Sequence, residues 1–237
     1  MLVDQERRQR PLVFVDDLAQ PVLAPGDLQH FQKSLRLRFG DPIGVGDGRG
    51  RWMPARLGEV AEPEGPIHTE APPVVAVGVA FAPVKAERPD FVVQKLVELG
   101  VDRIVVVTTD RSVVKWDDTR AGKQFERWQN VVTEACMQSR RLHRPTIEGP
   151  TPLRHLAADG YDVVLAEPGA PRLGLDPHRG SGSAEETPSM LVCVGPEGGW
   201  SAAELAAYDH VGLPGNILRA ETAAIAAGVL LVASRPV

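Results

Sequence analysis

Two glycine-containing loops, both in the last fifth of the chain, offer the clearest place for chemistry. Residues 195–199 (GPEGG) follow the apolar run 191–194, and residues 213–216 (LPGN) precede residues 217–223 (ILRAETA). Glycine has no Cβ, so backbone N–H and C=O groups in such loops can approach a ligand closely. The charged side chains beside these loops are Glu197, Arg219 and Glu221. We therefore expect one ligand-binding site that uses both loops.

The elements that position these loops alternate between strands and helices. Apolar, β-branched runs predict buried strands at residues 74–81, 103–107, 161–166 and 191–194, and helical spacing predicts helices at residues 85–100, 120–141 and from about 220 to 234. Such alternation is typical of an α/β domain with a parallel sheet. Ligands in these sheets lie at the carboxyl ends of the strands. Three segments have that placement: residues 166–168, 195–199 and 213–218.

The first 72 residues show a different pattern, one of short strands separated by turns. Residues 12–15 form one apolar run, and residues 42–45 and 51–57 flank a glycine-rich turn, which predicts a hairpin. A short helix is expected from residue 27 to about 35. The alternate glycines at 44–50 do not favour a dinucleotide site, because a strand rather than a helix follows them. A proline-rich segment, residues 61–73, predicts a linker, so we expect a domain boundary after residue 72.

Composition limits the possible classes of protein. The chain has 237 residues, of which 43% are hydrophobic, and this is enough for a packed core. No stretch reaches the roughly 18 to 20 apolar residues of a membrane span, and residues 1–10 are too polar for a secretory leader. The six histidines and two cysteines never fall at metal-ligand spacing, so we expect no metal. Two distant cysteines are typical of reduced thiols in a cytoplasmic protein.

The distribution of charge modifies what the net charge of −5 implies. Residues 111–145 carry eight Lys and Arg against four acids, whereas residues 160–237 carry four Arg against nine acids. A basic middle beside an acidic end fits a protein that presents one face to a polyanion such as nucleic acid. Solvated helix faces produce similar runs, so charge alone does not establish RNA binding.

The loop sequences resemble the signature pair of the SPOUT RNA methyltransferases, and within them the branch that methylates N3 of a uridine in small-subunit (16S) ribosomal RNA. The helix pattern Lys85, Arg88, Gln94-Lys95, Glu98-Leu99-Gly100 and the segments Arg127-Trp128 and 134–145 match the same branch. Two departures are present: Arg140 replaces a usual Gly, and Pro214-Gly215-Asn216 replaces Gly-Pro-Arg. The resemblance covers most of the chain.

This resemblance implies a fold and partners that residue patterns alone do not give. We expect a small PUA-like RNA-binding β-barrel over residues 1–72, followed by a SPOUT α/β methyltransferase domain with a trefoil knot over residues 73–237. The implied cofactor is S-adenosyl-L-methionine, the implied substrate is 16S rRNA or the small ribosomal subunit, and the implied assembly is a homodimer in the cytoplasm. The cofactor-binding residues implied are Leu165, Glu167, Pro168, Val194, Gly195, Pro196, Glu197, Gly198, Gly199, Leu213, Gly215, Ile217, Leu218, Thr222 and Ala223.

Methylation of a uridine nitrogen also requires groups that act on the base. Arg141 and Arg219 are candidates to pair with phosphate or with the uracil oxygens as negative charge develops. Glu221 is a candidate for catalysis, although capping of the following helix is the stronger reading because acids favour helix N-termini. Glu197 is either a neighbour of the sulfonium or a solvated loop acid. The candidate RNA-binding residues are Arg10, His30, Arg36, Arg111 and Arg140.

Two other functions remain open at this stage. The protein can be a SPOUT methyltransferase that acts on another RNA or another base atom, or a non-catalytic RNA-binding or ribosome-assembly protein that keeps the fold. The close-approach glycines favour an enzyme, since a purely RNA-binding protein does not need them at these loops.

Overall fold

The computed structural model describes residues 2–83, 88–112, 118–158, 160–173 and 189–235. The chain divides into two compact units: unit 1 comprises Met1–Pro72 and Thr133–Arg144, and unit 2 comprises Pro73–Val132 and Pro145–Val237. Segment Thr133–Arg144, which we expected in the second domain, groups with unit 1 because it pairs with a turn there. Arg144 N donates to Gly48 O at 3.0 Å, and Arg49 and His143 form a β-bridge.

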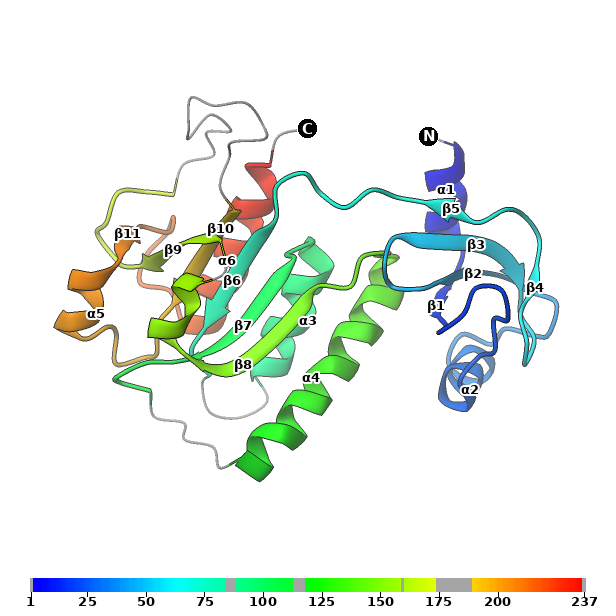
Figure 1. The fold of residues 1–237 in the computed structure, drawn as a ribbon, viewed down its shortest axis with the longest axis horizontal. Coiled ribbons are helices and arrows are strands. Elements are labelled where there is room, and N and C mark those ends of the chain that lie inside the picture. The colour runs from blue at the N-terminus through cyan, green and yellow to red at the C-terminus, as the bar shows by residue number, and fades with distance from the viewer. Residues whose placement is uncertain (1, 84–87, 113–117, 159, 174–188, 236–237) are drawn as a thin grey trace. The chain divides into compact units, whose positions relative to one another are not determined.

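Unit 1 is built on a five-stranded sheet with two helices in the same part of the chain (Figure 1). The expected hairpin is confirmed, since β2 (Pro42–Gly46) and β3 (Arg51–Arg56) pair antiparallel, and β1 (Leu12–Phe14) pairs parallel with β2. The expected short helix is α2 (Pro25–Lys33). Helix α1 (Leu2–Gln9) forms where the sequence showed only polar character.

The expected linker at residues 61–73 is not without structure. Strands β4 (Glu62–Pro63) and β5 (His68–Thr69) both pair antiparallel with β3. Each has only two residues, Pro63 lies within β4 and Pro66 lies between the two strands, so no alternating pattern marks them in the sequence. The prediction of an unpaired linker was therefore wrong for these residues.

Unit 2 contains a parallel sheet of six strands, which confirms the α/β class. In sheet order the strands are β11 (Asp209–Val211), β9 (Tyr161–Ala166), β10 (Ser189–Val194), β6 (Val77–Phe81), β7 (Arg103–Thr108) and β8 (Thr146–Pro152), and every pair is parallel. Four of these strands were predicted. Strand β8 escaped prediction because Gly149, Pro150 and Pro152 interrupt its pattern, and β11 because it has only three residues.

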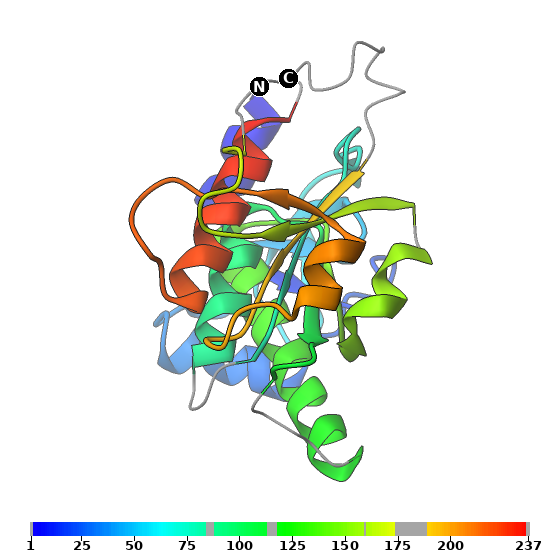
Figure 2. The same ribbon diagram turned by 90° about the vertical axis from the view of Figure 1, so that its left-hand side faces the viewer.

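Helices cover both faces of this sheet (Figure 2). Helix α6 (Ala220–Ala233) packs against β6, β10 and α3 (Arg88–Leu99). Helix α5 (Ala202–Ala207) and the 3₁₀ helix η1 (Leu153–Ala158) lie on the opposite face. The expected start of α3 at Lys85 lies outside the described residues. A Cβ on Gly228 would lie 2.8 Å from Leu96 Cδ2, so this glycine permits the close approach of α6 to α3.

Successive strand residues point to opposite faces of the sheet, so every second residue of its strands points toward η1 and α5. There they form a buried cluster with side chains of η1 and with Trp200. Its members are Ala80, Ala82, Val105, Val107, Leu153, Leu156, Leu165, Leu191, Cys193 and Trp200. Because the sheet is covered on both faces, β6 is buried at every position and β7 at all but its last, as parallel strands usually are. The helix α4 (Asp118–Ser139) buries Trp128, whose Nε1 donates to Asp90 Oδ1 at 3.0 Å. Within the described ranges, no helix is long and apolar enough to cross a membrane.

Candidate functional site

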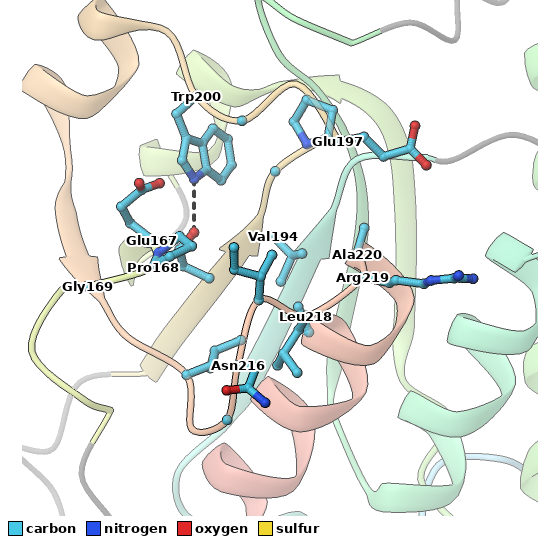
Figure 3. Close-up of a pocket in the computed structure, with 18 residues that line it drawn as sticks. Glu167, Pro168, Gly169, Val194, Glu197, Trp200, Asn216, Leu218, Arg219 and Ala220 are labelled. Atoms are coloured by element: carbon cyan, nitrogen blue, oxygen red, sulfur yellow. Dashed lines mark hydrogen bonds between the residues drawn. The ribbon is translucent and has the colours of Figure 1, made fainter.

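A pocket of about 1220 Å³ lies at the carboxyl ends of three neighbouring strands, β11, β9 and β10. This is the edge where parallel sheets bind ligands. The segments expected from the sequence supply most of its lining. The lining residues are Ala166, Glu167, Pro168, Gly169, Val194, Gly195, Pro196, Glu197, Gly199, Trp200, Leu213, Gly215, Asn216, Ile217, Leu218, Arg219, Ala220 and Ala223. Figure 3 shows these side chains arranged around a common space.

The first wall of the pocket, residues 194–200, follows β10 and folds back toward β9. A Cβ added to Gly195 would lie 2.9 Å from Cε2 of Trp200, so glycine is required where the chain passes the indole ring. Trp200 is 4% exposed, and its Nε1 donates to Ala166 O at 3.0 Å (Figure 3). Gly199 has φ +68°, a conformation that favours glycine. The indole therefore ties the first wall to the end of β9.

Helix α5 fixes the far end of this wall through a capping box. Ser201 Oγ accepts from Glu204 N at 3.2 Å, and the Glu204 carboxylate accepts from Ser201 N at 2.8 Å. A reciprocal cap of this kind satisfies two backbone donors that would otherwise lack partners. The direction in which the chain leaves the pocket is thereby set.

The second wall, residues 213–218, joins β11 to α6. Its entrance is anchored: Gly212 N donates to Pro171 O at 2.7 Å, and Leu173 N donates to Gly212 O at 2.8 Å. Its centre is exposed to solvent, since Asn216 is exposed and Ile217 is 90% exposed. Gly215 has φ +108°, so the turn depends on a residue without Cβ. The sequence Pro214-Gly215-Asn216, which replaces the Gly-Pro-Arg of the family pattern, thus keeps a glycine at the position where the turn requires one.

Charged groups lie at two different edges of the pocket. Glu197 and Arg219 are exposed and extend toward the same side, whereas Glu167 lies beside Trp200 (Figure 3). Arg219 is the N-cap residue of α6, but its side chain makes no capping hydrogen bond. Its guanidinium therefore extends from the mouth of the pocket. A mouth with one carboxylate and one guanidinium can both accept a proton and stabilise a developing negative charge.

Most predicted cofactor-binding residues line this pocket, and three do not. Leu165 is fully buried in the core beneath it, and Thr222 is exposed on α6. Gly198 is exposed beside the pocket, where its carbonyl accepts from Arg111 Nη1 at 2.9 Å. The lining residues that were not predicted are Ala166, Gly169, Trp200, Asn216 and Ala220. For Trp200 the available signal, which was not used in the prediction, is an aromatic residue directly after close-approach glycines.

The three predicted catalytic residues do not occur together on the described surface of the pocket. Arg219 lines it, whereas Glu221 is half-buried in the first turn of α6 and is not part of the lining. Such a position agrees with the capping reading of Glu221. Arg141 is a half-buried residue of unit 1.

The predicted RNA-binding residues of unit 1 have contrasting surroundings. His30 and Arg36 are exposed. Arg10 instead pairs with Glu6 at 2.9 Å and with Glu64 at 2.8 Å. The pKa of the Glu64 carboxyl lies below its usual value, chiefly because of the hydrogen bond from Arg10. Structural ion pairs within unit 1 thus account for Arg10 without RNA.

Arg140 explains one departure from the family pattern. It follows the last residue of α4 and has φ +61°, the left-handed conformation in which helices usually end with glycine. A side chain there costs about 1 kcal/mol. Its guanidinium offsets part of this cost by donating to the carbonyl oxygens of Met137 and Gln138. The side chain of Arg140 therefore caps α4.

Known proteins resemble the chain at the level of sequence. Residues 70–232 match the family model of the RNA methyltransferase domain. The ribosomal RNA small subunit methyltransferase E of Mycobacterium tuberculosis is 32% identical over 218 residues, which cover 84% of this chain and 80% of that protein. The protein of the same name from Bacillus subtilis is 33% identical over 159 residues, covering 63% of this chain and 62% of its own length.

Solved structures resemble the chain over nearly its whole length. The ribosomal RNA small subunit methyltransferase E of Neisseria gonorrhoeae, bound to S-adenosyl methionine, has a TM-score of 0.74 and 26% identity, covering 93% of this chain and 96% of that one. A methyltransferase of Legionella pneumophila in complex with the same cofactor has a TM-score of 0.78 and 25% identity, covering 94% and 96%. The fold is thus that of an RNA methyltransferase. More particularly, the chain belongs to the family that contains the ribosomal RNA small subunit methyltransferase E proteins.

Proposed function

We propose that this protein transfers a methyl group from S-adenosylmethionine to N3 of a uridine in small-subunit (16S) ribosomal RNA. The observation that carries the proposal is the pocket at the carboxyl ends of β9, β10 and β11, because both signature loops line it. Family membership and relatives named as small-subunit rRNA methyltransferases support the reaction class. The related structure that holds S-adenosyl methionine supports the cofactor.

The residues of the pocket fit such a cofactor. Val194, Leu213 and Leu218 offer apolar surface for a purine ring, and the glycines at 199 and 215 leave backbone uncovered for hydrogen bonds. Glu167 and Glu197 supply negative charge for an ammonium or a sulfonium group. The bound group supplies an electrophilic methyl on sulfur. The residues of both walls would hold the group, and methyl transfer requires that they orient it toward the attacking nitrogen.

Methylation at N3 also requires a group that removes the imide proton. Glu221 remains a proposal for this step, but its half-buried place in the first turn of α6 makes it the weaker candidate. Glu197 extends from the mouth of the pocket on the same side as Arg219 (Figure 3). We therefore assign the N3 proton to a Glu197 carboxylate oxygen. The Arg219 guanidinium then donates to a uracil oxygen on which negative charge builds.

Unit 1 and the assembly complete the proposal. The five-stranded sheet of unit 1 takes the role of a PUA-like RNA-binding barrel, with His30, Arg36 and Arg141 as phosphate or base contacts. The SPOUT domain carries the trefoil knot, and two copies form a cytoplasmic homodimer. Light scattering at working concentration measures the assembly directly, and a monomeric mass would contradict the dimer.

The test of this function is methyl transfer to its natural substrate. Small ribosomal subunits from cells lacking the protein are incubated with labelled S-adenosylmethionine, and the modified nucleoside is identified by mass spectrometry. We expect the label in 3-methyluridine. Label in another nucleoside would keep the enzyme class but change its specificity. Absence of both label and cofactor binding would leave a non-catalytic RNA-binding protein.

A further inference from the structure

The loop that follows β7 contacts the loop that follows β10, although β6 separates these strands in the sheet. Arg111 Nη1 donates to Gly198 O at 2.9 Å. Ser201 Oγ donates to Asp110 Oδ2 at 2.6 Å, and Asp110 N donates to Glu204 Oε1 at 2.9 Å. Three hydrogen bonds thus join Asp110 and Arg111 to Gly198, Ser201 and Glu204. Gly198 belongs to the first wall of the pocket, and the other two residues lie at the start of α5 directly after it.

Glu204 is the buried centre of these contacts. Only 8% of this acid is exposed, and its two carboxylate oxygens accept from backbone N–H groups of two separate segments, Ser201 and Asp110. A buried carboxylate is costly unless hydrogen bonds compensate it. Capping of α5 alone would require only the bond to Ser201. The second bond, to Asp110, has no role in the helix and serves to join the two loops.

We propose that Asp110, Arg111, Ser201 and Glu204 form a clamp that positions the first wall for the cofactor. The clamp fixes two points, the Gly198 carbonyl and the start of α5. These two fixed points set the path of residues 195–199. Arg111 is then a positioning residue of the cofactor loop rather than primarily a phosphate contact. This inference about ligand binding rests on the proposed function. The existence of the clamp itself depends only on the contacts above.

A purely structural network makes a different prediction from a positioning network. If the contacts only stabilise the fold, their loss lowers the melting temperature without changing affinity for S-adenosylmethionine. If they position the wall, their loss weakens cofactor affinity while the KM for small ribosomal subunits stays the same. A phosphate role for Arg111 predicts the reverse, a higher KM for the subunits at unchanged cofactor affinity.

The substitution series uses conservative partners as controls. Asp110→Ala removes the acceptor for Ser201 Oγ, whereas Asp110→Asn retains an oxygen that can accept it. Arg111→Ala removes the donor to Gly198 O, whereas Arg111→Lys retains a single donor. We expect Asp110→Ala and Arg111→Ala to raise the cofactor Kd about tenfold, since one charge-assisted hydrogen bond is lost in each. Asp110→Asn should restore affinity to within about twofold.

The readouts separate failure of the clamp from failure of the proposed function. Calorimetry with the wild-type protein establishes cofactor binding first, and the variants are then titrated alongside measurements of both KM values. Hydrogen exchange of residues 197–204 in the ligand-free proteins tests the clamp independently, and we expect about tenfold faster exchange in Asp110→Ala. Unchanged exchange in that variant, or unchanged cofactor Kd in both alanine variants when the wild type binds, would overturn the proposal. Should Asp110→Ala fail to fold, Arg111→Ala compared with Arg111→Lys, measured by the same exchange and titration experiments, tests the proposal through the bond to Gly198 O.

Discussion

The two walls of the pocket are built in opposite ways. The first wall, residues 194–200, begins at the end of β10 and is held at its other end by the Trp200 indole and by the capping box of α5 that follows it. The second wall, residues 213–218, is anchored at Gly212 but exposes Asn216 and nearly all of Ile217. The same pocket thus combines a rigid side with an exposed one.

This difference indicates a division of labour. A wall fixed before the ligand arrives costs no ordering free energy when the ligand binds, whereas an exposed loop loses conformational freedom at that moment. We therefore infer that the first wall sets the geometry of methyl transfer. We also infer that the second wall orders when the ligand binds, and Arg219 at its end is the residue proposed to contact the base.

The largest effect that would sharpen this comparison is expected at Arg219. Arg219→Ala removes the guanidinium at the mouth of the pocket, and turnover should fall about a hundredfold, as when one donor to a developing negative charge is lost. Cofactor affinity should change much less. Single-turnover kinetics and calorimetry measure the two quantities, with Arg154→Ala, an exposed arginine outside the pocket, as control. Equal losses of turnover and affinity would move Arg219 from the base to the cofactor.

The rigid wall should tolerate no added atom at Gly195. Gly195→Val places a side chain against the buried Trp200 ring, and we expect cofactor affinity to fall about thirtyfold, as for an overpacked site. Gly198→Ala is the matched control, because its Cβ would meet only Arg111 atoms at 3.6 Å or more. Calorimetry compares both variants with the wild type. Similar losses in both variants would show that the loop as a whole, rather than contact with Trp200, determines affinity.

One apolar side chain on each wall can be truncated to compare how much the two walls contribute to the free energy of unfolding. Val194→Ala removes two methyl groups from a side chain that is 4% exposed, so the free energy of unfolding should fall by about 1.5 kcal/mol. Ile217→Ala changes a side chain that is 90% exposed, so stability should change by less than about 0.5 kcal/mol. Denaturant unfolding measures both values. A large loss at Ile217 would mean that the second wall is packed in solution.

The smallest effects concern the two buried thiols. Burial raises the pKa of Cys136 to about 11 and also raises the pKa of Cys193, which lies on β10 beneath the first wall. The thiol of Cys136 ionises at a lower pH in the unfolded protein than in the folded protein. Its contribution to the free energy of unfolding is therefore complete below about pH 8.5 and is lost as the pH rises toward the pKa of the folded state. Cys136→Ala should remove this part of the alkaline loss. Neither thiol should react with iodoacetamide in the folded protein, and rapid labelling of Cys193 would show that the rigid wall opens.

The sequence was most informative where local chemistry fixes local structure. Glycines, prolines and apolar runs leave their pattern over a few positions, so both loops and four strands of the parallel sheet were predicted. The role of Trp200 was not predicted, because it depends on the chain folding back toward Ala166. The bond between Asp110 and Glu204 joins residues 94 positions apart, and no periodicity records such a contact.

Other misses have equally particular causes. Strand β8 follows a proline and contains two more, so its sequence reads as a loop, yet pairing with β7 maintains it as a strand. The left-handed backbone of Arg140 and the α4 carbonyls that its guanidinium reaches were also not predicted, and RNA contact by Arg140 stays a prediction. At β8 a tertiary contact outweighed the local pattern, whereas the contacts of Arg140 are local to the end of α4.

Hydrogen exchange with and without S-adenosylmethionine tests the central claim most directly, because it reports on both walls in one experiment. The account predicts that saturating cofactor slows exchange strongly in residues 213–219 and little in residues 195–201, which are already held in the free protein. Protection gained mainly in residues 195–201 would reverse the assignment of the two walls. No change in either segment at saturating cofactor would contradict the pocket as the binding site.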